Sequence, residues 1–215
     1  SGTLLAQITG TLLIDIDMLH ESLHKSDDKH LQDLSDEVYK NSTRLSSMIL
    51  NMLDLAMLDA KKIELERSTV NFSELVKERV KSCRSVYLQG KPIDFKLTIE
   101  PEILISIDPN YIRQVVDNIV INAITFSDSG LIEVTVSTQK NFVTLVITDQ
   151  GKGIPPKELA DIFDPFKMGS NSESKAEGRG VGLALCKAAI EAHDGVIKAE
   201  SNGKKGAKFR VVLPL

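Results

Sequence analysis

Apolar residues recur at every third or fourth position in the first sixty residues, and this spacing predicts two amphipathic helices. A first helix is expected over residues 4–23, and the polar residues 25–28 offer N-caps for a second. The apolar stripe of the first helix is Leu5, Ile8, Leu12, Ile16, Leu19 and Leu23. The second helix has a heptad-like seam at Leu31, Leu34, Val38, Asn41, Leu45, Met48, Met52 and Leu55.

That seam has one polar member, Asn41, which either fixes the helix register or faces a hydrated gap. Further leucines at positions 50, 53 and 58 widen the apolar surface beyond a single seam. Such a helix needs more partners than one neighbouring helix supplies. We therefore expect an antiparallel helical hairpin that pairs with a second copy, so that a homodimer forms a four-helix bundle.

Beyond the charged residues 61–68 the pattern changes, and we expect two domains, 1–66 and 67–215. A helix is predicted from a cap at Asn71 or Ser73 to about residue 89, and Asp108-Pro109 is a strong start signal for another. A β-hairpin is predicted from residues 93–99 and 103–107. The remaining predicted elements are strands 131–137 and 142–148, a helix at 181–192, and strands 196–200 and 208–213. The predicted fold class is α+β, with one sheet covered by helices on one face.

Composition narrows the class of protein. With 42% hydrophobic and 26% charged residues the chain is typical of soluble domains, and a net charge of −4 without a basic stripe argues against nucleic-acid binding. No apolar run approaches the roughly 18 residues that span a bilayer, and no signal peptide is expected. Cys83 and Cys186 lie far apart within apolar helical patterns, which favours buried free thiols over a disulfide.

Two glycine clusters carry the candidate chemistry. Asp149 ends an apolar strand-like run, and Gly151 and Gly153 follow it directly. A second cluster opens the next helix-like run at Gly178, Gly180 and Gly182. A carboxylate at a strand end, together with glycines that let backbone N–H groups face a phosphate chain, suits a nucleotide. Taken singly, each cluster favours an ordinary turn beside a flexible loop, and only the two clusters together with an asparagine pair upstream favour a nucleotide site.

Two asparagines strengthen the nucleotide interpretation. Asn118 and Asn122 are four residues apart and share one face of the helix that begins after Asp108. Asparagine is neutral and its oxygen can ligate phosphate-bound Mg²⁺. Helical asparagines are often merely solvated, but these two stand among Val and Ile, where an idle polar side chain is costly.

Four sequence stretches together resemble the motifs of sensor histidine kinases. The stretch VVDNIVINAITFS is similar to the N box, DQGKGI to the G1 box, IFDPFKM to the F box and GRGVGLAL to the G2 box. They occur in the family's order and spacing, and the helical hairpin resembles its dimerisation and phosphotransfer domain. Four ordered motifs are far more specific than a single glycine motif.

The resemblance implies a Bergerat (GHKL-type) ATP-binding fold, shared with gyrase, the Hsp90 chaperone and mismatch-repair ATPases. It implies that Asp149 accepts a hydrogen bond from the adenine amino group, that Gly151 and Gly153 shape the pocket, and that Asn122 ligates Mg²⁺ with Asn118 near the phosphates. Phe126 would pack beside the nucleotide. The lid would span residues 167–179 and be anchored by Phe163 and Phe166. Gly178, Gly180 and Gly182 would close over the phosphates, and Lys167 and Arg179 are the candidates for neutralising phosphate charge. Thr125 stands where the family usually has Lys, which removes one expected positive charge.

The phosphoacceptor motif of the family is degenerate in this chain. Alignment of the first helix places Gly10 at the acceptor position and Thr11 where the family has Glu. The acceptor reaction needs an imidazole nitrogen and a neighbouring carboxylate, and neither glycine nor threonine provides these groups. The spacing to the second helix does not suit His20, and we expect His20, His24, His30 and His193 to be solvated surface residues.

Three functions follow from this pattern. The first is a divergent or pseudo histidine kinase that binds Mg-ATP, dimerises through its N-terminal helices and contacts a response regulator or partner kinase. The second is an active kinase that phosphorylates a histidine elsewhere or on a partner, and the third is a non-catalytic dimeric interaction module. We expect a cytoplasmic location, either as a separate protein or as the cytoplasmic part of a larger or membrane-anchored sensor.

Overall fold

The computed structural model describes residues 16, 18–20, 23, 28–39, 42, 65–88, 90–165 and 182–215. The chain divides into two compact units, Ser1–Met57 and Leu58–Leu215. No helix in these described ranges is long and apolar enough to cross a membrane.

The described residues of the first unit form helix on both sides of Asp28, which confirms the predicted helical hairpin. The two helices contact each other through His20. Its ring stacks on Tyr39, with 4.5 Å between ring centroids, and its Nδ1 atom lies 3.1 Å from Ser35 Oγ. His20 is therefore half-buried rather than solvated, because the second helix covers it. Seam positions 41, 45, 48, 52 and 55 lie outside the described residues.

The second unit contains two sheets, not the single sheet predicted. The five-stranded sheet has the order β2 (Ile93–Ile99), β4 (Gly130–Gln139), β5 (Phe142–Thr148), β7 (Lys208–Pro214) and β6 (Val196–Glu200). A two-stranded sheet pairs β1 (Ser68–Asn71) with β3 (Leu104–Ile107). The short strand β1 was not predicted, because it occupies only four residues between the charged stretch 61–68 and the helix cap at Asn71.

The predicted hairpin of residues 93–99 and 103–107 is wrong. Strand β2 pairs in parallel with β4, and β3 pairs antiparallel with β1. The intervening turn is held by other elements: the Glu100 carboxylate accepts hydrogen bonds from the Thr138 N–H and hydroxyl, each 2.7 Å long. On the other side, the Ser73 hydroxyl donates to the Glu100 carbonyl and accepts from the Ile103 N–H. These bonds direct the two strands into different sheets.

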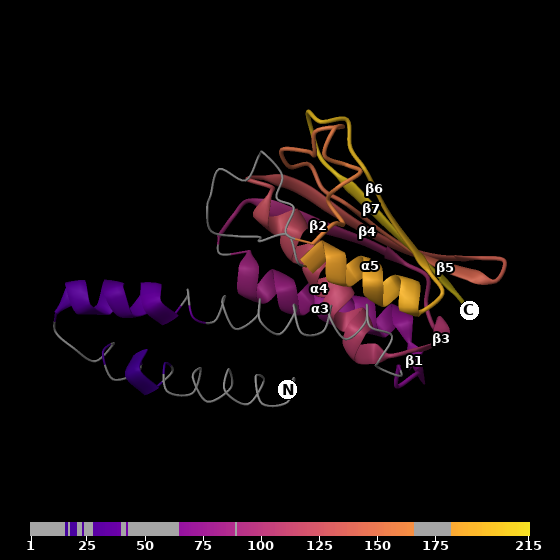
Figure 1. Cartoon of the computed structure of the whole chain (residues 1–215), viewed down its shortest axis with the longest axis horizontal. Helices are drawn as coiled ribbons and strands as arrows, with labels where there is room; N and C mark the ends of the chain where they lie inside the picture. The colour runs from indigo at the N-terminus through magenta and orange to yellow at the C-terminus, as the bar shows by residue number, and fades with distance from the viewer. Residues whose placement is uncertain are drawn as a thin grey trace. The chain divides into compact units, whose positions relative to one another are not determined.

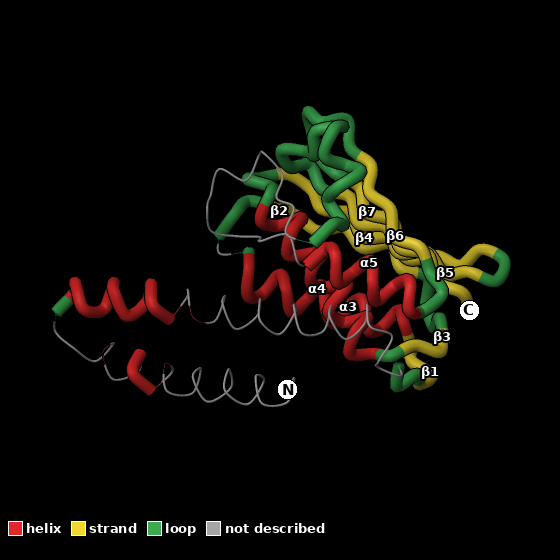
Figure 2. Tube along the Cα trace, in the orientation of Figure 1, coloured by secondary structure: helices red, strands yellow, loops and turns green. Residues whose placement is uncertain are grey.

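Three helices lie on one face of the five-stranded sheet (Figures 1 and 2). They are α3 (Phe72–Tyr87), α4 (Pro109–Thr125) and α5 (Gly182–Ala192). Asn71 rather than Ser73 caps α3, because its side chain accepts from the Glu74 N–H. The predicted start of α4 is confirmed: the Asp108 side chain accepts from the Asn110 N–H, and Pro109 occupies the first turn.

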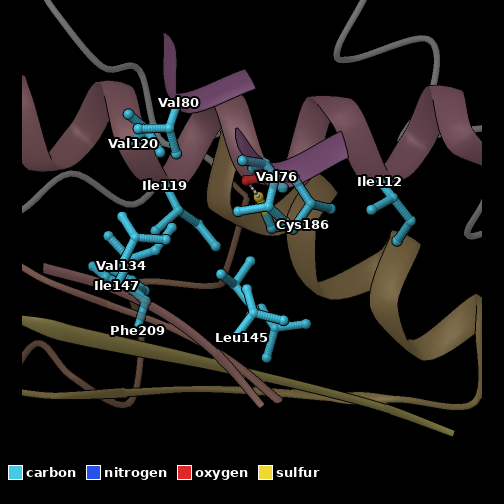
Figure 3. Packing of buried hydrophobic residues seen from close by; sticks show 14 of the residues in the cluster. Val76, Val80, Ile112, Ile119, Val120, Val134, Leu145, Ile147, Cys186 and Phe209 are labelled. Carbon is cyan, nitrogen blue, oxygen red and sulfur yellow. Dashed lines mark hydrogen bonds between the residues drawn. The ribbon is translucent and has the colours of Figure 1, made fainter. Parts of the chain in front are cut away.

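Alternation along the strands explains which face the helices cover. In β5 the side chains of Val143, Leu145 and Ile147 are buried, whereas the residues between them are partly exposed. The paired residues of β7, including Phe209, follow the same alternation. Figure 3 shows the strand residues Val134, Ile147 and Phe209 beneath Ile119 of α4. Ile119 belongs to the buried core between the sheet and the helices. The odd-numbered residues of β5 and β7 therefore point toward the helices.

Polar contacts fix α3 on α4 beside this core. Arg79 donates two 2.8 Å hydrogen bonds to the Asp117 carboxylate, and the Cys83 thiol donates a third at 3.3 Å. Burial, with the nearby Asp117 charge, raises the pKa of Cys83 to about 12. Burial also raises the pKa of Cys186 to about 12. Both thiols are free and buried, as predicted.

The expectation that His193 is solvated is wrong: only 1% of its surface is exposed. Its ring lies between the end of α5 and the start of α4, where both ring nitrogens have backbone partners. His30 is exposed as expected, and His24 lies outside the described residues.

The C-terminal end of α4 supplies a stability test. Lys91 Nζ donates to the carbonyls of Ile124 (2.9 Å), Thr125 (3.3 Å) and Ser127 (3.1 Å), which otherwise lack helical partners. Lys91→Met should destabilise the unit by about 1–3 kcal/mol, lowering Tm by roughly 2–4 °C per kcal/mol. Lys96→Met is the matched control, because Lys96 forms an exposed ion pair with Glu133. Equal melting temperatures for both variants would contradict the capping role.

Candidate nucleotide-binding site

Asp149 is the buried polar residue around which the candidate site is built. It follows Ile147 by two positions and therefore points to the helix-covered side of the sheet. Only 6% of its surface is exposed. Its Oδ1 atom accepts from the N–H groups of Gly151 (2.8 Å) and Ala207 (3.2 Å). Because both bonds from neighbouring residues end on Oδ1, the second oxygen, Oδ2, remains for a ligand.

The environment of Asp149 changes its acidity in two opposite ways. Burial raises the pKa of the carboxyl, and the backbone N–H groups of Gly151 and Ala207 lower it. Burial is the larger effect, so the pKa lies above its ordinary value. A carboxylate kept partly desolvated in this way binds a hydrogen-bond donor more strongly than one in water does.

The loop after Asp149 is fixed by close backbone contacts. A Cβ atom on Gly151 would lie 2.2 Å from the Phe126 carbonyl oxygen, so the approach requires glycine. Lys152 N–H donates to that same carbonyl at 3.1 Å. Gly153 has a φ of 75°, in the left-handed region that glycine adopts readily. The G1 loop is thus held against the end of α4.

The structure also brings Asn118 and Gly182, the last glycine of the second cluster, together. Asn118 Nδ2 donates to the Gly182 carbonyl at 3.4 Å, and a Cβ atom on Gly182 would lie 3.1 Å from Asn118 Oδ1. Asn122 is half-buried, one helical turn further along α4. No residue in the described part of the chain hydrogen-bonds its side-chain amide. Phe126 ends α4 and is half-buried.

Phe163 packs on the core through an edge-to-face contact with Phe209, with 6.5 Å between ring centroids. The remaining predicted site residues lie outside the described residues. They are Gly10, Thr11, Phe166, Lys167, Gly178, Arg179 and Gly180, together with the whole predicted lid, residues 167–179.

Two residues of the site were missed by the sequence analysis. A Cβ atom on Gly206 would lie 2.2 Å from the Asp149 carbonyl oxygen, and Gly206 N–H donates to the Gly151 carbonyl at 2.7 Å. The Ser127 hydroxyl is buried beside Gly151 and has no hydrogen-bond partner among the described residues. A glycine two residues before the start of the predicted last strand was the available signal for Gly206. Ser127 had no such signal.

A polar hollow of about 340 Å³ shares Asp149, Gly206 and Ala207 with this arrangement but extends from them toward the other face of the sheet. Its lining includes Thr148, Glu200 and Lys208, whose positions in the strands place them on the face away from the helices. The asparagines of α4 do not line it. We therefore place the candidate site on the helix side, where Asp149 and α4 meet.

Comparison with known proteins agrees with this geometry. Residues 107–215 match the family described as histidine kinase-, DNA gyrase B- and HSP90-like ATPases, and the chain belongs to this family. It is 34% identical to the sensor protein KdpD of Clostridium acetobutylicum over 190 residues, covering 87% of this chain and 21% of KdpD. It is 29% identical to the sensor histidine kinase RcsC of Escherichia coli over 178 residues, covering 81% of this chain and 19% of RcsC. The chain thus spans about a fifth of these relatives.

Solved structures of histidine kinases share the fold. Full-length ShkA in complex with AMPPNP superposes with a TM-score of 0.77 at 22% identity, covering 100% of this chain and 46% of ShkA. The nucleotide-free catalytic domain of histidine kinase ThkA superposes with a TM-score of 0.61 at 28% identity, covering 70% of this chain and 96% of that domain.

The raised pKa of Asp149 yields a second stability prediction. Its folded pKa exceeds the unfolded value near 3.9, so the folded state binds the extra proton and loses stability as pH rises through the folded pKa. Asp149→Asn keeps an oxygen for the Gly151 and Ala207 N–H groups without the charge. Its Tm at pH 7 should equal or exceed that of the native chain, and the difference should shrink toward pH 4. Asp128→Asn, at an exposed position, is the control; a lower Tm for Asp149→Asn at pH 7 would contradict this.

Proposed function

We propose that this chain is the core of a histidine-kinase-like signalling protein of two-component type that binds Mg-ATP. In this proposal, Gly10 at the phosphoacceptor position makes autophosphorylation within the segment chemically unavailable, so the chain is a divergent or pseudo histidine kinase. The observation that carries the ATP-binding part is the buried Asp149 carboxylate, with one oxygen bonded to the backbone and the other left for a ligand.

The arrangement around Asp149 favours adenine over guanine. The Oδ2 atom would accept a hydrogen bond from the exocyclic amino group of adenine, a charge-assisted bond in a desolvated setting. Guanine presents a carbonyl oxygen at the corresponding ring position, and two acceptors facing each other repel. Gly151 and Gly153 allow the G1 loop to approach Phe126 and Gly206 closely, which holds the loop beside Asp149 at the C-terminal end of α4.

The polar face of α4 suits the phosphate end of the nucleotide. Asn122 would ligate Mg²⁺ through its side-chain oxygen, with Asn118 near the phosphates. The contact between Asn118 and Gly182 supports this, because it places the start of α5 beside the asparagines. Further proposed contacts come from the lid and its flanks: Phe163, Phe166, Lys167, Gly178, Arg179 and Gly180. Thr125 supplies no positive charge where the family usually has Lys.

The N-terminal helices support a proposal of homodimerisation. In the described part of the second helix, Leu31, Leu34 and Val38 of the seam are 39%, 51% and 43% exposed in one chain. A second copy would cover such a stripe in a four-helix bundle. We propose that the domains are 1–66 and 67–215. The bundle would contact a response regulator or partner kinase, and the chain would be cytoplasmic.

A labelling experiment tests the function. With γ-labelled ATP and Mg²⁺, the chain should bind nucleotide in calorimetry yet acquire no acid-labile, base-stable label. Asp149→Asn should weaken ATP binding by about 10- to 100-fold, the equivalent of a charged hydrogen bond. Label on the protein would instead show an active kinase. No heat and no thermal shift with the native chain would favour the interaction module.

Substitutions of Asn118 and Asn122 should differ in their effects on stability and on ATP affinity. Asn122→Ala should lower Mg²⁺-dependent ATP affinity by about 10- to 100-fold. The free energy of unfolding should change by less than about 0.5 kcal/mol, because the Asn122 amide has no partner in the described residues. Asn118→Ala should also lower Tm, because it removes the hydrogen bond to Gly182. Calorimetry with and without Mg²⁺, and thermal unfolding, measure both. An Asn122→Ala chain that binds Mg-ATP normally would exclude the metal role.

A further inference from the structure

His193 has two backbone partners in the interior of the second unit. Its Nδ1 atom lies 2.7 Å from the Ala189 carbonyl oxygen, to which it donates. Its Nε2 atom accepts a 2.9 Å hydrogen bond from the Asp108 N–H. These partners select the neutral imidazole with its proton on Nδ1, because Nε2 must keep a lone pair for Asp108.

The Asp108 contact joins three parts of the chain. Asp108 caps α4 through Oδ1, and its Oδ2 accepts a 3.0 Å hydrogen bond from the Glu66 N–H. Next to Glu66, the Arg67 guanidinium donates to the Ala192 carbonyl at 3.0 Å and to the Asp194 carboxylate at 2.9 Å. Residues 65–67, which lead into β1, are therefore bonded to the start of α4 and the end of α5.

The same two helices meet again beside the candidate nucleotide site. Asp108 and Asn118 are ten residues apart at α4, and Gly182 and Ala192 are ten residues apart on α5. Ten helical residues rise about 15 Å. Hydrogen bonds thus join the antiparallel helices at both ends, Asn118–Gly182 at one and His193–Asp108 at the other. Between them the Cys186 thiol donates to the Val115 carbonyl at 3.9 Å.

We propose that His193 is a positioning residue of the nucleotide site, and that its neutral ring holds α5 in register on α4 and connects residues 65–67 to Asn118 and Gly182. The proposal rests on the proposed function, because it assumes that ATP binds between these helices. His193 itself is separated from Asn118 by the length of α5, so it acts through helix placement rather than through contact with the nucleotide.

Protonation of His193 would break this connection. A proton on Nε2 would face the Asp108 N–H, donor against donor. The charged groups that face the ring are Arg67, Asp108 and Asp194. Burial lowers the pKa of His193 and Arg67 lowers it further, whereas the Ala189 carbonyl, Asp108 and Asp194 raise it. Because the folded pKa lies below the ordinary value near 6.5, the stabilising effect is complete above about pH 6.5 and is lost as pH falls through the folded pKa.

The test compares ATP affinity between pH 7.5 and 5.5 in the full chain, with Mg²⁺ present and with the folded fraction checked at each pH. The native chain should lose affinity progressively as pH falls below about 6.5 toward the folded pKa of His193, because burial lowers that pKa. His193→Gln keeps an acceptor and a donor but does not titrate, so its affinity at pH 7.5 should be near native and its pH dependence weaker. His30→Gln, at an exposed position, should behave as the native chain.

A second variant tests the connection to residues 65–67. Arg67→Met removes the bonds to Ala192 and Asp194 at a partly exposed position, and it should lower ATP affinity at pH 7.5 without unfolding the chain. Native affinity in Arg67→Met, or an unchanged pH dependence in His193→Gln, would overturn the positioning role while leaving the proposed function intact. Absence of ATP binding by the native chain at pH 7.5 would overturn the proposed function and, with it, this inference.

Discussion

The burial of the Asp149 carboxylate constrains how the second unit, Leu58–Leu215, can fold. A buried Asp needs fixed hydrogen-bond donors, and here they come from Gly151 and Ala207 on two segments 56 residues apart in the chain. Supplying both donors requires β5 and β7 to be neighbours in the sheet and the G1 loop to turn back sharply. The close approaches of Gly151 to Phe126 and of Gly206 to Asp149 are the steric consequence of that requirement.

Helix α4 contacts the rest of the second unit at its C-terminal end, its middle and its N-cap. Its C-terminal end contacts the G1 loop and is capped by Lys91. Its middle presents Asn118 to the start of α5, and its N-cap contacts His193. A shift of α4 along its axis would disturb all three contacts at once. The apolar face of the helix resists such a shift, because Ile119 and its neighbours pack tightly on the sheet.

The sequence predicts the local parts of this site well. Asp149 at a strand end and the glycines of the G1 loop follow from short-range rules, and the structure places them together. The cap at Asp108 follows from the same kind of rule and lies at the other end of α4. Long-range pairing was not predictable in the same way. Strands β2 and β3 are adjacent in sequence and alternate like a hairpin, yet Glu100 and Ser73 bind the turn to other elements. His193 was taken for a surface residue because its partner Asp108 lies 85 residues away.

The proposed function separates two requirements that an autophosphorylating kinase must meet together. Binding ATP requires an acceptor for adenine and a polar face for Mg²⁺ and phosphate, and the residues of α4 and the G1 loop have that chemistry. Transferring the phosphoryl group also requires a nucleophilic imidazole in reach, and in the proposed pseudo-kinase Gly10 stands at the acceptor position without such a group. In that proposal the consequence of ATP binding is conformational. A ligand can shift such an equilibrium only by its difference in affinity for the two states. The two points that fix α5 on α4 are where such a difference would arise, since one adjoins the proposed phosphate site and the other is bonded to residues 65–67.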